Sequence, residues 1–316
     1  MITRFGATAI AAALAAGALA ASAGPAGATD DTLTLSNPHV VAHFDLSAGQ
    51  TPEDVAVEPD GSADVSFSEA DEVARVTLGG QVTVLGQLPR TGPCAPNPVA
   101  LSLGLVRVLD GTLFLVDCTG DANTGVWRIR PGQAPAQIAT LPANSFPNDM
   151  ALDPLHGQLY IADSALATVW RVPVAGGAPV AWISDATLAK TSFIGANGIA
   201  VHGQAVWVSN TDMGTIVRVP IQADGTAGPV RTVVTGMAGA IDNFVFVPGT
   251  DLILAALVVA NEVVLIQDGQ AHAVLTGADG LSNPTSVAVQ RDTVYVGDGA
   301  VAGGGDPNLL IAHIDR

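Results

Sequence analysis

The stretch PNDMALDPLHGQLYIADSALATVWRVPVAGGAPVAWI, residues 147–183, contains four short apolar runs separated by turn-forming residues. His156-Gly157, for example, stands between the first run and the second. Runs of four to eight residues rich in Val, Ile, Leu and aromatic side chains, bounded by Gly, Pro, Asp or Asn, are typical of β-strands joined by tight turns. The stretch therefore predicts one antiparallel unit of four strands.

The same unit recurs along the chain at intervals of 43 to 50 residues. Near the start of its first run stand Glu53, Leu103, Asn148, Asn197, Asp242 and Thr285. A unit of this size cannot bury its apolar face alone, so the units must stack on one another. Six stacked units of four strands predict an all-β fold, a six-bladed β-propeller.

The last unit ends after its third strand, Leu309 to Ile314. The segment His39 to Asp45 is strand-like and precedes the first unit. We expect this N-terminal segment to pair in the last blade as its missing outer strand, because that closure leaves no exposed sheet edge. The propeller is accordingly expected over residues 39–316, after a linker over residues 29–38.

The N-terminus has the features of a targeting segment. Arg4 precedes an apolar run, Ala7 to Ala21, and small residues at Ala21-Ser22-Ala23 and Ala26-Gly27-Ala28 suit a signal peptidase. The run is shorter than the ~20 residues that span a bilayer. These features predict a signal peptide over residues 1–28, a secreted protein and no membrane span; a cytosolic chain with an Ala-rich N-terminal helix is the alternative.

The chain has 12 Lys and Arg residues against 29 Asp and Glu residues, a net charge of −17. No basic stripe is present to neutralise phosphates, which argues against a nucleic-acid partner. An acidic excess usually serves solubility, and it also leaves room for a cation site. We expect a soluble monomer.

The two cysteines are predicted to form a disulfide. Cys94 lies in a Pro-rich loop just before one inner strand, and Cys118 lies just after the next strand, which runs back to the same end. Antiparallel neighbours therefore bring the two thiols together, and export permits the bond.

The first strands of all six blades begin at the same end of the propeller, so their opening residues form a ring around the axis. The second ring position is occupied by Asp54, Gly104, Asp149, Gly198, Asn243 and Ser286. The repulsion between four carboxylates near a narrow axis needs a compensating positive charge. No Lys or Arg occupies an equivalent position in any blade. Oxygen donors suit Ca²⁺ or another hard divalent cation such as Mg²⁺, whereas Zn²⁺ and copper favour His or Cys. The alternative is that Asn and Asp start these strands because they suit the preceding turns.

These motifs resemble those of the senescence marker protein (regucalcin)/gluconolactonase family and its paraoxonase-type relatives. The matching residues are Glu53 in Pro-Glu-Asp, Asn148 in Pro-Asn-Asp, Asn197 in Ala-Asn-Gly and Asp242 in Ile-Asp-Asn. The resemblance implies a propeller that holds a divalent metal, usually calcium, at the end of its axis. It assigns the metal to Glu53, Asn148, Asn197 and Asp242, with Asn243 beside them.

The paired pattern is most similar to the paraoxonase-like branch, which carries a second, structural calcium deeper in the channel. Asp54 and Asp149 match its side-chain ligands, and a backbone oxygen near Leu103 would complete that site. The histidine dyad of that branch has no match, because Ser102-Leu103-Gly104 stands at its place. The ring also lacks the arginine that often binds a sugar-acid substrate in the gluconolactonase branch. This absence argues against a sugar lactone as substrate.

The predicted function is a secreted, Ca²⁺-dependent hydrolase of lactones or small esters. Asp242 is the candidate base that takes a proton from water, and Asn148 is the candidate partner that holds metal and substrate. The alternative is a non-catalytic, NHL-like propeller that binds a protein, peptide or glycan and uses calcium structurally. A concave pocket favours the enzyme, and a flat end favours the binding module. Four further residues close the second strands at the ring end: Asp117, Asp163, Asn210 and Asp298. They either line the mouth of a pocket or cap turns, and we expect turn caps.

Overall fold

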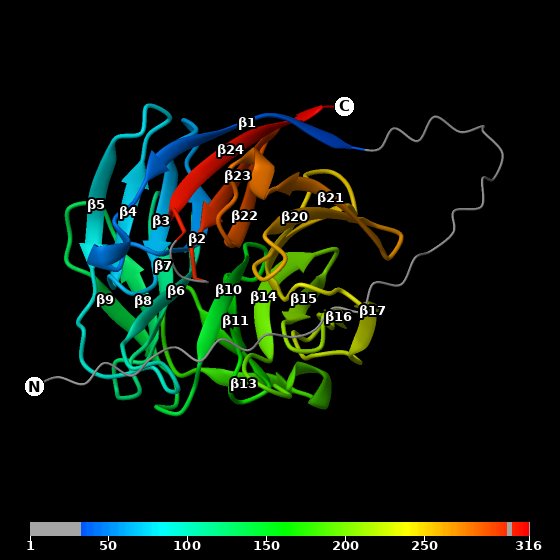
Figure 1. The fold of residues 1–316 in the computed structure, drawn as a ribbon. Helices are drawn as coiled ribbons and strands as arrows, with labels where there is room; N and C mark the ends of the chain where they lie inside the picture. Colours follow the sequence, from blue (N-terminus) through cyan, green and yellow to red (C-terminus); the bar gives the residue numbers. More distant parts are fainter. Residues whose placement is uncertain (1–32, 302–304, 316) are drawn as a thin grey trace, which may run out of the picture. The chain divides into compact units, whose positions relative to one another are not determined.

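The computed structural model describes residues 33–301 and 305–315. Six four-stranded antiparallel sheets stand around one axis as a six-bladed β-propeller (Figure 1), which confirms the predicted fold. The predicted signal peptide, residues 1–28, and the first residues of the predicted linker lie outside the described residues. None of the helices in the described ranges has the length and apolar character needed to cross a bilayer.

The strands of each blade follow the chain from the axis outward. Blade 1 contains β2 (Pro52–Val57), β3 (Ala63–Phe67), β4 (Glu72–Val76) and β5 (Val82–Gln87). Blade 2 contains β6 (Leu101–Arg107), β7 (Leu113–Cys118), β8 (Gly125–Ile129) and β9 (Ala136–Thr140). Blade 3 contains β10 (Pro147–Asp153), β11 (Gln158–Asp163), β12 (Thr168–Pro173) and β13 (Val180–Ser184).

The other three blades repeat this order. Blade 4 contains β14 (Ala196–His202), β15 (Ala205–Asn210), β16 (Thr215–Pro220) and β17 (Arg231–Val234). Blade 5 contains β18 (Ile241–Phe246), β19 (Ile253–Leu257), β20 (Glu262–Gln267) and β21 (Gln270–Thr276). Blade 6 contains β22 (Pro284–Gln290), β23 (Thr293–Asp298), β24 (Asn308–Asp315) and, from the other end of the chain, β1 (Thr34–His43). Three short 3-10 helices lie between blades: η1 (Leu46–Ala48), η2 (Ala186–Leu188) and η3 (Gly277–Asp279).

The N-terminal strand closes the propeller as expected. β1 pairs antiparallel with β24, from Thr34 opposite Asp315 to His43 opposite Asn308. The strand begins earlier than the expected residue 39, because Leu33 and Leu35 join the apolar cluster between blades 5 and 6. The pairing covers the edge of β24 that would otherwise be open to another strand.

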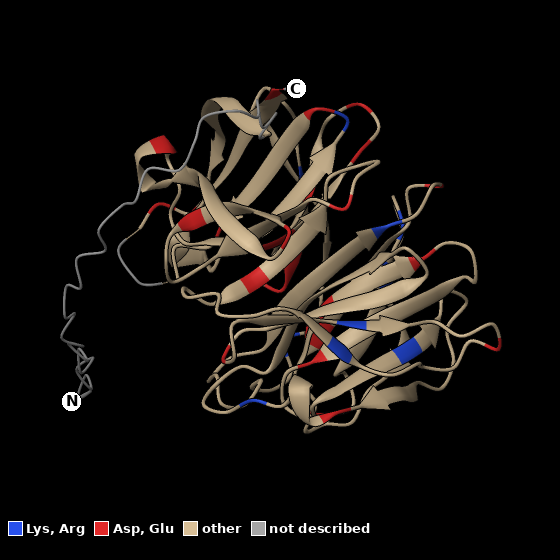
Figure 2. Cartoon of the chain, turned by 90° about the vertical axis from the view of Figure 1, so that its right-hand side faces the viewer, with Lys and Arg blue, Asp and Glu red and all other residues tan. Residues whose placement is uncertain are grey.

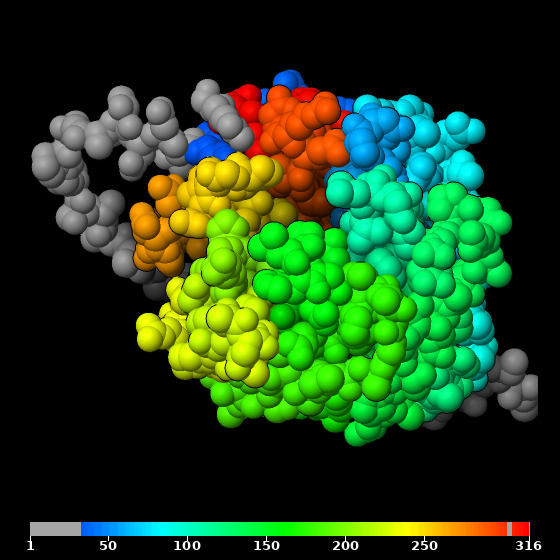
Figure 3. Space-filling model, turned by 180° about the vertical axis from the view of Figure 1, so that it is seen from behind, coloured from blue at the N-terminus to red at the C-terminus, as the bar shows by residue number. Residues whose placement is uncertain are grey.

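The apolar core lies between neighbouring blades. All six residues of β7 are buried, as are all five of β3 and all five of β19. One core cluster joins Tyr160 and Trp182 of blade 3 to Val206 and Val217 of blade 4. The space-filling view shows the colours of successive blades following one another around the molecule (Figure 3). Each sheet is thus buried by its neighbours, which is why the repeat must occur in a closed set.

All six inner strands are irregular at the same place, near the ring. The register shifts between Pro52 and Asp54, Ser102 and Leu105, Pro147 and Asp149, Ala196 and Ile199, Ile241 and Phe244, and Pro284 and Ser286. A bulge leaves residues unpaired and re-aims their side chains. The ring residues therefore leave the hydrogen-bond ladder between the first and second strands, and their side chains turn toward the axis.

Two ring positions are glycine because neighbouring blades approach closely there. A Cβ atom at Gly104 would lie 2.5 Å from the Cα atom of Asp149. A Cβ atom at Gly198 would lie 2.6 Å from the carbonyl oxygen of Asp242. No larger residue fits at either place unless the backbone moves.

The predicted disulfide is present in the structure. Cys94 and Cys118 are bonded, with Cα atoms 5.1 Å apart, and both side chains are buried. The bond ties the loop between blades 1 and 2 to the end of β7, across 24 positions of sequence.

The double variant Cys94→Ala/Cys118→Ala should be less stable by about 3 kcal/mol, because the bond closes a loop of this size and restricts the unfolded chain. Urea unfolding measures the difference. Reductant should lower the midpoint of the wild-type protein and leave that of the variant unchanged. Equal midpoints for the oxidised wild type and the variant would show that the bond contributes nothing.

Candidate functional site

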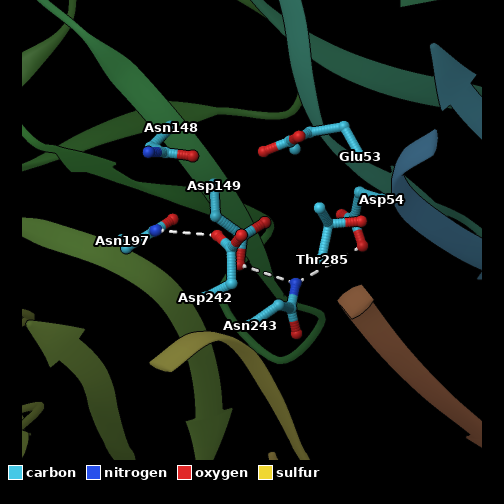
Figure 4. Close-up of a pocket in the computed structure, with 9 residues that line it drawn as sticks. Glu53, Asp54, Asn148, Asp149, Asn197, Asp242, Asn243 and Thr285 are labelled. Carbon is cyan, nitrogen blue, oxygen red and sulfur yellow. Dashed lines mark hydrogen bonds between the residues drawn. The ribbon is translucent and has the colours of Figure 1, made fainter. Parts of the chain in front are cut away.

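Ring residues from all six inner strands line one small cavity (Figure 4). The lining residues are Glu53, Asp54, Gly104, Asn148, Asp149, Asn197, Asp242, Asn243 and Thr285. The cavity is small. The volume open to the centre of a water molecule is about 10 Å³, which leaves room for about one water molecule or ion. The structure thus brings together every predicted ring carboxylate and amide. Leu103 is not among the lining residues.

The deeper layer of the ring is formed by Asp54 and Asp149, which are 7% and 5% exposed. The Leu105 amide donates to Asp54 Oδ2 at 2.7 Å, and the Ile199 amide donates to Asp149 Oδ2 at 2.8 Å. Each donor belongs to the next blade and lies at a bulge. The two carboxylates therefore satisfy amides that the bulges free, and they link blade 1 to blade 2 and blade 3 to blade 4.

Asn243 lies between these two carboxylates (Figure 4). Its amide nitrogen is 3.4 Å from Asp54 Oδ1 and 3.2 Å from Asp149 Oδ2. The Ser286 hydroxyl donates to Asp54 Oδ1 at 2.7 Å. Asn243 therefore contacts the deeper layer through its nitrogen, whereas the sequence placed it with the outer metal ligands.

The outer layer consists of two half-buried carboxylates, Glu53 and Asp242, and two buried amides, Asn148 and Asn197. The Asn197 amide nitrogen donates to Asp242 Oδ1 at 2.7 Å. The amide oxygen of Asn148 points toward Glu53 (Figure 4). The outer layer thus presents oxygen atoms to a common centre.

Two hydroxyl residues that the sequence analysis missed hold these amides. Ser164 accepts from the Asn148 amide nitrogen at 3.1 Å and donates to the Ala196 carbonyl oxygen of the next blade at 2.5 Å. Thr211 accepts from the Asn197 amide nitrogen at 2.9 Å and donates to a carbonyl oxygen of blade 5 at 2.7 Å. Each directly follows the last residue of the second strand of its blade. A Ser or Thr at that position is the sequence feature that could have indicated these contacts.

Burial raises the pKa of all four ring carboxyls. The pKa of Glu53 is raised well above its ordinary value, first by desolvation and then by the charges of Asp242, Asp54 and Asp149. Desolvation raises the pKa of Asp242 to about 7, against the hydrogen bond from Asn197. It also raises the pKa of Asp54 to about 6 and that of Asp149 well above its ordinary value. Since no Lys or Arg lines the cavity, full ionisation of the ring is unfavourable without an added cation.

The donor set of the cavity consists of carboxylate and amide oxygens, which is the chemistry of Ca²⁺ or Mg²⁺ and not of Zn²⁺ or copper. In the part of the chain that the structure describes, no group of three or more His, Cys, Asp or Glu side chains could hold a metal by itself. Two of the four outer donors are amides, and the deeper carboxylates already accept backbone amides. The Leu103 carbonyl oxygen, expected near a second ion, accepts a hydrogen bond from the Ser66 hydroxyl at 2.7 Å.

The four residues expected to cap turns at the ring end divide into two groups. Asp163 accepts amide hydrogen bonds from Phe146 and Ala165, and Asn210 accepts one from Met213, so both cap turns. Asp117 and Asp298 each keep one carboxylate oxygen without a partner among the described residues. Burial raises the pKa of Asp117 to about 8 and that of Asp298 to about 7.

Residues 56–243 match the model of a family described as a repeat of unknown function, DUF6923. The chain belongs to this family. The match includes the ring residues from Leu103 to Asn243 and leaves Glu53, Asp54 and Thr285 outside it. DUF6923 membership by itself therefore assigns no chemistry to the ring.

Solved structures share the fold of this DUF6923 protein at low sequence identity. A gluconolactonase from Xanthomonas campestris is 16% identical, with a TM-score of 0.64, over 92% of this chain and 98% of that one. A calcium-binding protein, regucalcin, from Agrobacterium tumefaciens is 18% identical, with a TM-score of 0.64, over 87% and 94%. The PQQ-bound aldose sugar dehydrogenase of Streptomyces coelicolor is 14% identical, with a TM-score of 0.66, over 91% and 100%. A search of curated proteins gave no significant match.

In the presence of a chelator, the protein should lose stability as pH rises from about 5 to about 8. Carboxyls with a raised pKa bind more protons in the folded than in the unfolded state. The free energy of unfolding therefore decreases as pH rises from the ordinary Asp pKa of 3.8 to the raised pKa values of about 6 to 8. Urea unfolding at several pH values measures this slope.

Asp242→Asn should reduce the slope, and Asp224→Asn is the matched control. The Asp224 side chain is exposed and the pKa of its carboxyl is lowered by hydrogen bonds from Thr226, so it titrates below this window. A stability that stays flat or rises across the window would contradict the raised pKa values.

Proposed function

We propose that this protein is an exported hydrolase of lactones or small esters that depends on a divalent cation, with Ca²⁺ as the expected ion. The observation that carries the proposal is the ring itself: four carboxylates with raised pKa values surround an ion-sized cavity that no cationic side chain lines. The likeness to a gluconolactonase and to a calcium-binding regucalcin supports the proposal at the level of the fold.

The cation would be held by Glu53, Asn148, Asn197 and Asp242, whose side chains present oxygen at the outer layer. When bound there, a divalent cation supplies polarisation of an ester carbonyl and stabilises the charge that develops on its oxygen. A second ion between Asp54 and Asp149 would need the Asn243 amide nitrogen to turn away from both carboxylates. One ion is therefore the simpler expectation.

Asp242 has the properties of a general base. Its Oδ1 atom is fixed by the Asn197 amide, and Oδ2 is left to accept a proton. The pKa of this carboxyl is raised to about 7 in the ring without a cation. A bound cation would lower this pKa and keep the carboxylate ionised, in the form that accepts a proton. Asp242 would take a proton from water as the water oxygen bonds to the carbonyl carbon. It would return that proton to the alkoxide oxygen when the ester bond breaks, which gives a hydroxy acid from a lactone.

The substrate must lie above the ring, because the cavity has space for only about one ion. The loops at the ring end carry exposed apolar side chains, including Phe193, Met213, Val259 and Val301. These side chains suit the hydrocarbon part of a neutral lactone or ester. A sugar acid finds no arginine or lysine among the residues that line the cavity.

A second candidate function follows from the small size of the cavity. A propeller whose axial ion is purely structural would bind a protein, peptide or glycan across the same end, as an NHL-like binding module. Bound calcium without hydrolysis of any lactone or ester would favour this second function.

Asp242→Asn should lower the rate of lactone and aryl-ester hydrolysis by about 10²- to 10⁴-fold, because it removes the proton acceptor. Hydrolysis by the purified protein is measured with and without chelator, and circular dichroism checks the fold. Asp224→Asn serves as the control with an exposed carboxylate. Full activity in Asp242→Asn, or in the chelated wild type, would overturn the mechanism.

Calcium should raise the melting temperature more at pH 8 than at pH 5, because protons compete for carboxyls whose pKa is raised. Glu53→Gln should weaken calcium binding, measured by calorimetry, and should diminish this pH-dependent stabilisation. Failure of the wild-type protein to bind calcium or another divalent cation would overturn the ring as a metal site.

A further inference from the structure

A second concave site lies on blade 3, at the end of the propeller opposite the ring. It is a groove of about 420 Å³, within the range of small-molecule sites. Its floor is the face of the blade 3 sheet, and its far wall is the loop between β16 and β17 of blade 4. The lining residues include His156, Gln158, Tyr160, Arg171, Ile221 and Gly225.

The floor of the groove is built from residues that face one another across strands. Tyr160 on β11 pairs with Arg171 on β12, which in turn pairs with Val180 on β13. Tyr160 is 1% exposed, and its ring packs edge-on against Trp182 with centroids 4.9 Å apart. The polar groups of the floor thus belong to a rigid, well-packed sheet.

Arg171 is fixed in place without an acidic partner. Its Nη1 atom donates to the Gly225 carbonyl oxygen at 2.5 Å, and the Trp182 indole nitrogen donates to the same oxygen at 2.9 Å. Among the described residues, no carboxylate lies within ion-pair distance of Arg171. A guanidinium carries five N–H donors, so most of them remain to bind an anion, and a carboxylate matches their planar geometry.

His156 lies at the edge of the groove and is held by Asp153. The buried Asp153 carboxylate contacts His156 Nδ1 at 2.7 Å and also accepts the amides of Leu155 and His156. These contacts hold the imidazole ring in place at the edge of the groove. Asp224, the acidic residue of the groove, is exposed and accepts hydrogen bonds from the amide and hydroxyl of Thr226.

We propose that this groove binds a small organic carboxylate with an apolar body. Arg171 holds the carboxylate, and the side chains of Val180 and Ile221 contact the apolar body. Charge complementarity supports this ligand class, because Arg171 is a cationic donor without an ion-pair partner among the described residues. The site is formed by other residues than the ring, so it does not depend on the ring being catalytic.

Calorimetric titration with hexanoate tests the proposal, with 1-hexanol as the neutral ligand of matched length. The wild-type protein should bind hexanoate at least tenfold more tightly than 1-hexanol. Arg171→Gln should weaken hexanoate binding at least tenfold. Arg128→Gln is the matched control, because Arg128 occupies the same place on β8 of blade 2, opposite Phe114, and lines neither this groove nor the ring cavity.

Val180→Glu provides a second variant at an exposed position, should Arg171→Gln fail to fold. It should weaken hexanoate binding, because it places a carboxylate opposite Arg171, while Asp242→Asn should bind hexanoate as the wild type does. Equal binding of hexanoate and 1-hexanol, equal losses in Arg171→Gln and Arg128→Gln, or no binding of hexanoate would each overturn the proposal. Loss of hydrolysis in Asp242→Asn leaves this site unaffected, so the two proposals fail separately.

Discussion

The approach of six inner strands to one axis is the constraint on which the rest of the structure depends. Each inner strand is bulged at the same position, so its opening residues leave the ladder. Backbone amides freed in this way need acceptors. Asp54 and Asp149 accept two of them across blade boundaries. The residues that make the ring acidic therefore also hold neighbouring blades together, and neither side chain can be replaced by an apolar one without loosening the fold.

This double role separates the two layers of the ring. In the deeper layer, amide and hydroxyl donors surround Asp54 and counteract part of the desolvation that raises its pKa to about 6. In the outer layer, Asp242 has one such donor, from Asn197, and its pKa is raised to about 7. The deeper layer is a structural element, whereas the outer layer keeps oxygen atoms available. Under the proposed function, the chemistry at this ring would therefore belong to the outer layer. Figure 2 shows how few Lys and Arg residues the blades carry beside the many Asp and Glu residues.

The sequence predicted the propeller, its closure and the members of the ring because these follow from spacing. Strand periodicity and the common starting end place Glu53, Asn148 and Asp242 around one axis without further information. The partners of the ring residues could not be predicted, because they depend on how far each blade is displaced against the next. Ser164 reaches a carbonyl oxygen 32 positions away.

Leu103 shows the same limit. The bulge between Ser102 and Leu105 turns its carbonyl oxygen toward Ser66 instead of the channel. The groove on blade 3 also depends on a contact across blades, between Arg171 and Gly225.

The fold alone does not assign an activity, since a gluconolactonase, a regucalcin and a sugar dehydrogenase share it. The chemistry of this chain has to be inferred from its own axis, where four carboxylates and no Lys or Arg line the cavity. Four ionised carboxylates around one divalent cation would still leave the ring with a net negative charge. Such a ring would favour a neutral ligand over an anionic one. Under the proposed function, a neutral ester that becomes a carboxylate on hydrolysis would suit that field at both stages, because the field would tolerate the substrate and repel the product.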